Sequence, residues 1–456
     1  MKAQIILETD ERVYKRPVLK DYVTNQSGDY VLLTLPEGVF VVLKAVDEKK
    51  KTTEHVRMTA GSIARDLGKK KITEAVIEQS VLSEYINIAD EQVVIAFVEG
   101  WHLGNYSFNT YQSKKDIVKP TLSVNGSSHE VVEVGEIRAD ATSFARDLMN
   151  ELSNVLNPET FPTRLQEEFK DTAVEVTVFD KSELEKREMN GVLTVGQGSQ
   201  YEPRFVELKY CNDSSKPLVA LVGKGVTFDT GGISLKGSRN LSDMRMDMGG
   251  AAAVSGALKL LAKSEAKVNV VGLIPMVENN IDQSSVLPGE VIKYKNGKTV
   301  QIGNTDAEGR LILADGLIRA GELEADYVVD IATLTGAIWA ALGSKMAGVF
   351  GEHELQVMLK ELGDENGDFN WPMPLVDAYE SYLKSDYADI CNISNKGEAG
   401  SITAALFLRH FVPENTKWAH VDIAGVMEST EKGYYGNSAT GFGTRLLADF
   451  TVRVSQ

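Results

Sequence analysis

Two acids and an arginine alternate with small residues in the heptad 304–310, Asn-Thr-Asp-Ala-Glu-Gly-Arg. A helical apolar pattern follows at once over 311–318, so we expect this polar segment to lie where a loop enters a helix. The free N–H groups and the positive dipole end of a helix start favour anions. If the segment is extended, Asp306, Glu308 and Arg310 point the same way and converge. Close carboxylates need a cation or a proton between them, so the segment is either part of a metal site or a helix start with a surface salt bridge.

An earlier segment carries further groups suited to metal chemistry. It is rich in glycine, follows a strand-like apolar run, and contains Lys224, Asp229, Lys236 and Asp247. Two divalent ions about 4 Å apart need bridging and terminal carboxylates, and the two segments together offer four. Neither segment contains a histidine. Read from residue types alone, such an oxygen-rich site favours Mg²⁺ or Mn²⁺ over Zn²⁺.

Together the two segments resemble the leucyl aminopeptidase family of two-metal exopeptidases. The heptad of that family's signature is complete here, and Lys224, Asp229, Lys236 and Asp247 stand at the family spacing. The resemblance covers the C-terminal two-thirds of the chain. It implies two divalent ions per subunit, zinc or manganese or else cobalt, and a neutral lysine amine among the ligands. A ligating amine must lose its proton, which burial beside a dication can enforce.

The resemblance also implies a role for each residue of the site. Asp229 and Glu308 would bridge the two ions, whose pairing lowers the pKa of a bridging water enough to give hydroxide near neutral pH. Lys236 would stabilise the tetrahedral oxyanion, and Arg310 would hold a bicarbonate that shuttles protons. The tighter ion would be held by Lys224, Asp229, Asp247 and Glu308, and the more exchangeable ion by Asp229, Asp306 and Glu308.

The substrate implied by the resemblance is a peptide with a free N-terminus. Met244, Thr333 and Gly336 would line an apolar pocket for the first side chain, so we expect leucine and other apolar residues to be preferred. The chain departs from the family pattern in two loops. In the segment 280–290, Leu287 and Glu290 replace the usual Arg and Asp, and after Lys236 the familiar proline is Gly237, followed by 238–240.

Two other functions fit parts of the pattern. The same metal chemistry would serve a carboxylate-metal phosphoesterase, but a lysine amine ligand and the lack of a GxxxxGK[ST] phosphate loop argue against it. A non-enzymatic role, such as nucleic-acid binding by an assembly of aminopeptidase fold, is opposed by the formal net charge of −17, because such a charge repels nucleic acid.

Composition is typical of a globular protein, with 43% hydrophobic and 25% charged residues. Cys211 and Cys391 are the only cysteines in 456 residues, too few for a disulfide framework and suited to a reducing cytosol. The N-terminal apolar stretch is too short for a signal sequence, and no apolar run reaches the roughly 18 residues needed to span a bilayer. We therefore expect a cytoplasmic enzyme, and the family resemblance implies a homohexamer.

The chain divides by pattern into three parts. Residues 1–138 are predicted to form a smaller α/β domain, with a hairpin over 30–43 and a buried strand over 93–100 that runs into a helix. Residues 139–163 contain a linker helix, because apolar side chains recur at helical spacing from Phe144 onward, with Thr142 or Ser143 as N-cap.

Residues 164–456 alternate strands and helices and form the predicted catalytic domain. Near-continuous apolar strands over 217–222, 267–275 and 327–331 are typical of a buried parallel sheet. The predicted fold is therefore α/β, with a mostly parallel sheet covered by helices on both faces. In such sheets ligands bind beyond the carboxyl ends of the strands. Both Lys224 and Thr333 follow strands directly.

Overall fold

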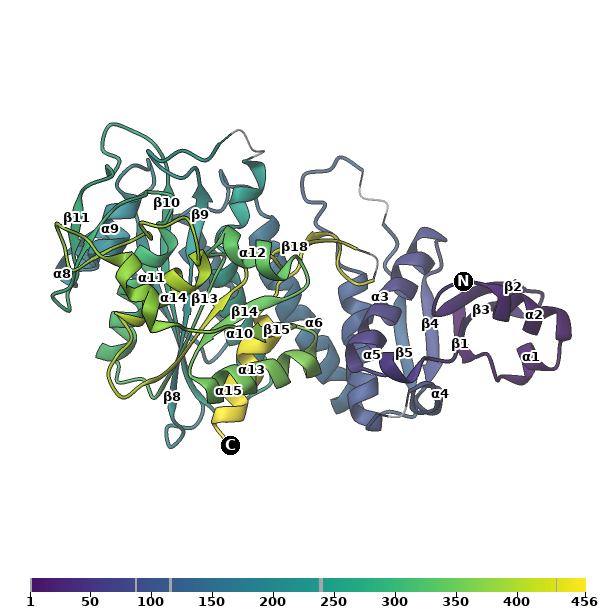
Figure 1. The fold of residues 1–456 in the computed structure, drawn as a ribbon. Coiled ribbons are helices and arrows are strands. Elements are labelled where there is room, and N and C mark those ends of the chain that lie inside the picture. The colour runs from purple at the N-terminus through teal and green to yellow at the C-terminus, as the bar shows by residue number, and fades with distance from the viewer. Residues whose placement is uncertain (1, 87, 115–116, 238–240, 432) are drawn as a thin grey trace. The chain divides into compact units, whose positions relative to one another are not determined.

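The structure, a computed structural model, describes residues 2–86, 88–114, 117–237, 241–431 and 433–456 (Figure 1). The chain forms two compact units. Unit 1 contains 1–143 together with 365–367 and 429–438, and unit 2 contains the rest. The limits predicted from the sequence, 1–138, 139–163 and 164–456, remain a prediction.

Unit 1 is built on a sheet with strand order β2-β3-β1-β4-β5. Strand β1 pairs in parallel with β3 and β4, and β4 with β5, while β2 and β3 form the predicted antiparallel hairpin. The strands are β1 (Lys2–Leu7), β2 (Tyr30–Leu35), β3 (Gly38–Leu43), β4 (Glu74–Glu78) and β5 (Thr121–Asn125). The helices are α1 (Glu11–Tyr14), α2 (Pro17–Asn25), α3 (Thr53–Lys69), α4 (Gln79–Tyr85) and α5 (Asp90–Gly104).

The predicted strand over 93–100 is wrong, because these residues lie inside helix α5. The helix is apolar almost all round, and periodicity alone cannot distinguish such a run from a buried strand. It packs closely against α3: a Cβ on Gly100 would lie 2.3 Å from the carbonyl oxygen of Arg57. The prediction from the apolar pattern did not take into account the small residues that permit this close helix packing.

The linker helix also begins earlier than predicted. Helix α6 spans His129–Asn150, so the predicted N-caps Thr142 and Ser143 are interior residues. The Thr142 hydroxyl donates to the carbonyl of Arg138 at 2.9 Å, which satisfies it inside the helix. The division between the two units falls within α6, after Ser143.

Unit 2 is centred on a mixed sheet with strand order β15-β14-β17-β13-β8-β10-β7-β6, and β9 pairs with β10 beyond the end of β8. Its middle is parallel, since β17, β13, β8 and β10 pair in one direction, while β14–β17, β10–β7 and β6–β7 are antiparallel. The strands are β6 (Glu175–Phe179), β7 (Arg204–Cys211), β8 (Leu218–Gly223), β9 (Gly225–Asp229), β10 (Asn269–Asn279), β13 (Tyr327–Ala332), β14 (Ala347–Gly351), β15 (Asn370–Pro372) and β17 (Lys417–Asp422).

Helices cover both faces of this sheet, as predicted (Figure 1). On one face of β8, Ala220 and Val222 pack into the core beneath α11 and α14. Because side chains alternate along a strand, Val219 and Leu221 point to the other face. There α10 packs on β8 and on α15. The helices are α7 (Thr160–Phe169), α8 (Lys181–Lys186), α9 (Asn190–Gly196), α10 (Gly249–Lys263), α11 (Gly309–Glu322), α12 (Gly336–Leu342), α13 (His353–Asn366), α14 (Gly400–Arg409) and α15 (Thr444–Val454).

Two smaller sheets complete the described chain. One consists of β11 (Val291–Lys293), β12 (Thr299–Gln301) and β16 (Ile390–Cys391); β11 and β12 precede the heptad in sequence, and β16 follows it. The other is the hairpin β18 (Glu428–Glu431) and β19 (Gly436–Ala439). No helix among the described residues is both long and apolar enough to cross a membrane.

Candidate metal centre

The first segment of the site follows the central strands β8 and β9. Lys224 comes directly after β8, and Asp229 ends β9, which pairs in parallel with β10. The chain then turns through Gly231 and Gly232, whose φ angles of 89° and 64° favour glycine, and reaches Lys236. Residues 238–240, which include part of the departure from the family pattern, lie outside the described residues.

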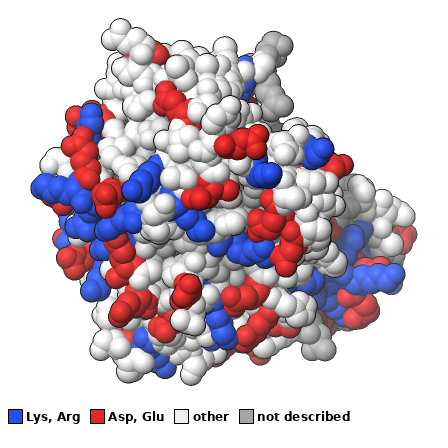
Figure 2. Space-filling view, turned by 60° about the vertical axis from the view of Figure 1, so that its left-hand side comes forward, with Lys and Arg blue, Asp and Glu red and all other residues white. Residues whose placement is uncertain are grey.

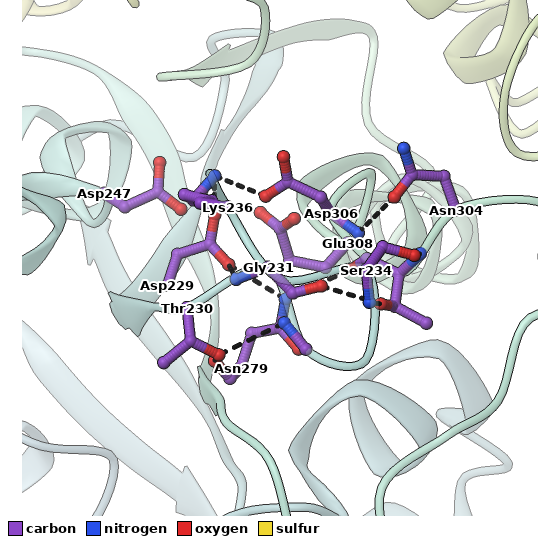
Figure 3. A network of polar contacts seen from close by, with 12 residues as sticks. Asp229, Thr230, Gly231, Ser234, Lys236, Asp247, Asn279, Asn304, Asp306 and Glu308 are labelled. Atoms are coloured by element: carbon purple, nitrogen blue, oxygen red, sulfur yellow. Dashed lines mark hydrogen bonds and ion pairs between the residues drawn. The ribbon is translucent and has the colours of Figure 1, made fainter. Parts of the chain in front are cut away.

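The heptad turns into the start of α11, so the predicted junction of loop and helix is confirmed. The segment is not extended, the condition under which i and i+2 side chains would converge, because the Ala307 N–H donates to the carbonyl of Asn304 at 3.2 Å and closes a turn. The Asn304 side chain also accepts from the N–H of Asp306 at 2.8 Å (Figure 3). Asp306 and Glu308 are therefore brought together by a turn and not by the two-residue repeat of a strand.

Three carboxylates from the two segments face one another. Asp229, Asp306 and Glu308 each offer an oxygen within 4.8 Å of the others. The ammonium group of Lys236 lies among them, 2.6 Å from Asp229 Oδ2 and in an ion pair with Asp306 (Figure 3). The carboxylates of Asp229, Glu308 and Asp247 outweigh the effect of burial and raise the pKa of Lys236 above its ordinary value.

Lys224 lies beneath this cluster and is buried. Its Nζ lies 2.7 Å from Asp247 Oδ2, 2.8 Å from Glu308 Oε1 and 2.9 Å from the carbonyl oxygen of Thr333. Burial favours the neutral amine, but the charges of Asp247, Glu308 and Asp229 raise the pKa of Lys224. Gly309 makes room for this side chain, because a Cβ there would lie 2.6 Å from Lys224 Cε.

Burial and crowding raise the pKa values of two of the acids. Burial raises the pKa of Glu308 to about 8, with a further contribution from Asp229, and raises that of Asp247 to about 6. Glu308 Oε2 is buried without a hydrogen-bond partner, which costs free energy unless a proton or a cation satisfies it. Four carboxylates and an amine therefore form a donor set that fits divalent cations.

Arg310 lies in the first turn of α11 and is buried. One Nη donates to the carbonyl oxygen of Asn392 at 2.8 Å, while its Nε is buried without a partner. Burial lowers the pKa of Arg310 to about 10. A desolvated guanidinium with an unused N–H is suited to a small anion.

The three predicted pocket residues lie on separate elements near the cluster. Met244 is half-buried in the short 3₁₀ helix Ser242–Met246, directly before Asp247. Thr333 donates from its hydroxyl to Asp247 Oδ1 at 2.7 Å. Gly336 begins α12, is exposed, and has open space where a side chain would be. Thr333 is thus hydrogen-bonded to a residue of the cluster. The role of Met244, Thr333 and Gly336 in binding the first side chain stays a prediction.

Several residues that hold the site together were not predicted. The Asn279 amide donates to Asp229 Oδ1 at 2.8 Å and to the carbonyl of Thr305 at 3.1 Å, so it joins the two segments. Asp422 accepts from the N–H groups of Leu334 and Thr335 and so shapes the loop that carries Thr333. Their position at the ends of β10 and β17 was the available signal.

Comparisons with known proteins show the family of this chain. Residues 143–448 match the catalytic domain of the cytosol aminopeptidase family, and residues 22–115 match its N-terminal domain. A probable cytosol aminopeptidase of Persephonella marina is 38% identical over 419 residues, which cover 90% of this chain and 84% of the relative. A protein of the same description from Aquifex aeolicus is 37% identical over 425 residues, covering 91% of this chain and 85% of that protein.

A solved structure also resembles this chain over its whole length. The bottromycin maturation enzyme BotP in complex with Mn is 30% identical, with a TM-score of 0.90 and coverage of 100% of this chain and 99% of that chain. Fold, site and relatives define a metal-dependent exopeptidase. The chain belongs to the cytosol aminopeptidase family, as its heptad and the spacing of its lysines and aspartates predicted.

Proposed function

We propose that this aminopeptidase removes leucine and other apolar residues from the N-termini of peptides. The main support for this proposal is that carboxylate oxygens of Asp229, Asp306 and Glu308 lie within 4.8 Å of one another. Lys224 and Lys236 lie beside these carboxylates. A metal ion in this site could bind the free α-amine of a peptide, which would explain a requirement for unblocked N-termini.

Two divalent ions per subunit are proposed to bind here. Lys224, Asp229, Asp247 and Glu308 would hold one, and Asp229, Asp306 and Glu308 the other. When bound, such ions polarise a carbonyl group and lower the pKa of water, so that hydroxide forms near neutral pH. The buried, unpaired Glu308 Oε2 supports this assignment. Manganese is supported by the Mn complex of BotP, while zinc and cobalt suit the same donors.

The residues around the ions have separate proposed tasks. Lys236 reaches the carboxylates from one side and would hold the negative oxygen that forms at the scissile carbonyl. Arg310, whose buried Nε has no partner, would hold a bicarbonate that receives and returns the proton. Met244, Thr333 and Gly336 would receive the first side chain, and the open space at Gly336 suits a group as large as leucine.

The other functions considered are less well supported. A phosphoesterase would need donors for a phosphate, whereas the described lysines of this site bind carboxylates. On the face of the molecule in Figure 2, basic side chains lie interspersed with acidic ones, and the net charge is −17; both oppose nucleic-acid binding. We further propose a cytoplasmic location, in keeping with the relatives' name, and a homohexameric assembly, as the family resemblance implies.

Hydrolysis of leucine p-nitroanilide and p-nitrophenyl phosphate tests the proposal. The purified chain is stripped with a chelator and assayed with Mn²⁺, Zn²⁺ or no added metal. We expect metal-dependent release of p-nitroaniline, little phosphatase activity, and loss of the reaction when the α-amine is acetylated. Metal-dependent phosphatase activity without peptidase activity would overturn it. A salt-dependent gel shift with DNA addresses the remaining alternative.

A further inference from the structure

Asn392 is hydrogen-bonded to the backbone of the heptad and of the residue before it. It follows the short strand β16, and its side chain is fully buried. Its N–H donates to the carbonyl of Gln301 at 2.9 Å, which fixes its main chain to the end of β12. The heptad begins three residues after Gln301, so Asn392 is anchored to the same strand that leads into the turn.

The whole hydrogen-bonding capacity of the Asn392 amide is used by that turn. Its Oδ1 accepts from the N–H groups of Gly303 at 2.8 Å and Asn304 at 3.3 Å. Its Nδ2 donates to the carbonyl oxygens of Asn304 at 2.8 Å and Ala307 at 3.3 Å. An amide offers two donors and two acceptor sites, and all four contacts go to backbone groups of residues 303–307.

Asn392 also contacts the arginine of the heptad. Its own carbonyl oxygen accepts from Arg310 Nη1 at 2.8 Å. One buried residue thus fixes the backbone on both sides of Asp306, the backbone just before Glu308, and the guanidinium group beyond. Because buried polar groups are costly when unpaired, a shift of this turn would leave several backbone groups unsatisfied at once.

We propose that Asn392 is a positioning residue for the metal centre, an inference that rests on the proposed function. It sets the places of the Asp306 and Glu308 carboxylates relative to Arg310, and it touches neither substrate nor metal. An amide is required: a carboxylate in its place would turn an oxygen toward the carbonyls of Asn304 and Ala307, and a smaller apolar residue would leave all four groups unpaired.

Calorimetric titration of the chelator-stripped full chain with Mn²⁺ tests this. We expect Asn392→Ala to weaken Mn²⁺ binding about 10-fold or more, as loss of outer-sphere partners does, and to lower kcat on leucine p-nitroanilide at saturating Mn²⁺. Asn392→Asp keeps the volume and adds a negative charge. If it also weakens Mn²⁺ binding, the amide donors are responsible; unchanged or tighter binding overturns the proposal.

The matched control is Asn370→Ala. Asn370, the first residue of strand β15, is also buried. Its amide donates to the carbonyls of Leu359 at 2.8 Å and Asp368 at 3.2 Å. We expect a similar loss of melting temperature but unchanged Mn²⁺ binding. Equal weakening of Mn²⁺ binding in Asn370→Ala and Asn392→Ala would make the effect one of general stability and overturn the inference. Failure of the wild-type chain to bind Mn²⁺ would instead refute the proposed function.

Discussion

Lys224 Nζ and Glu308 Oε1 lie 2.8 Å apart in a buried ion pair between the end of β8 and the turn before α11. Such a pair is stable only while both charges are satisfied. For Lys224 to bind a metal ion as an amine, its proton must leave and the pair must break. Metal binding, protonation and the contact between the two segments are therefore linked in this site.

Metal binding is expected to release protons. The pKa of Glu308 is raised to about 8 and that of Asp247 to about 6, so both groups hold protons below those values and must lose them to bind a cation. The affinity for Mn²⁺ should therefore fall as the pH decreases from about 8 to about 6. Calorimetry in two buffers of different ionisation enthalpy measures the protons released. An affinity independent of pH, with no proton release, would contradict this linkage.

Asp229 is expected to be required for metal binding. It contributes to the three-carboxylate cluster and is proposed to bridge both ions, so Asp229→Ala should lose bound metal. Elemental analysis of the purified protein measures this. Asp243→Asn is a suitable control, because Asp243 lies in the same stretch of chain but pairs with Arg245. Full metal occupancy in Asp229→Ala would argue against a bridging role.

Lys236 is expected to act in the reaction and not in metal binding. Removing this cation lowers the competition for the carboxylates, so Lys236→Ala should retain its metal while kcat falls about 10²-fold or more, as loss of an oxyanion donor does. Arg310→Ala should behave in the same way. Elemental analysis and steady-state kinetics separate the two effects, with Lys295→Ala, from a pair with Glu322 outside the site, as control. Loss of metal would assign either residue a structural role.

Asp315 should make stability depend on pH. It is buried in α11, its Oδ2 accepts from the N–H of Val192 at 2.8 Å, and burial raises its pKa well above the ordinary value. The folded chain therefore keeps a proton that the unfolded chain loses near pH 3.9, so stability falls as the pH rises above about 4. Asp315→Asn, neutral throughout, should melt at a higher temperature than the wild type at about pH 8 but not at about pH 4. A difference that does not change with pH would contradict this.

Residue pattern predicted the parts of the fold that depend on local chemistry. Strands β8, β10 and β13 are buried on both faces, so their apolar runs are continuous and easily recognised. The same continuity misled at α5, which is also buried all round. The start of α6 was missed because Thr142 is a good N-cap by type, yet its hydroxyl bonds within the helix.

The charged residues of the site could be predicted, but the residues that hold them could not. Lys224, Asp229 and the heptad carry charges at a recognisable spacing. Asn279 and Asn392 are single amides whose partners are mostly backbone groups of distant segments. Nothing in their local sequence shows which turn they will meet, because that depends on how β10 and β16 are arranged in space.

A crystal structure of the chain grown with Mn²⁺, with the ions located by their anomalous scattering, shows whether the two segments bind two metal ions. We predict two peaks, both within coordination distance of the Asp229 and Glu308 carboxylates, with the ion pair between Lys224 and Glu308 broken. If the ion pair stays intact and manganese is absent from the carboxylates or bound elsewhere, these two segments do not form a two-metal site.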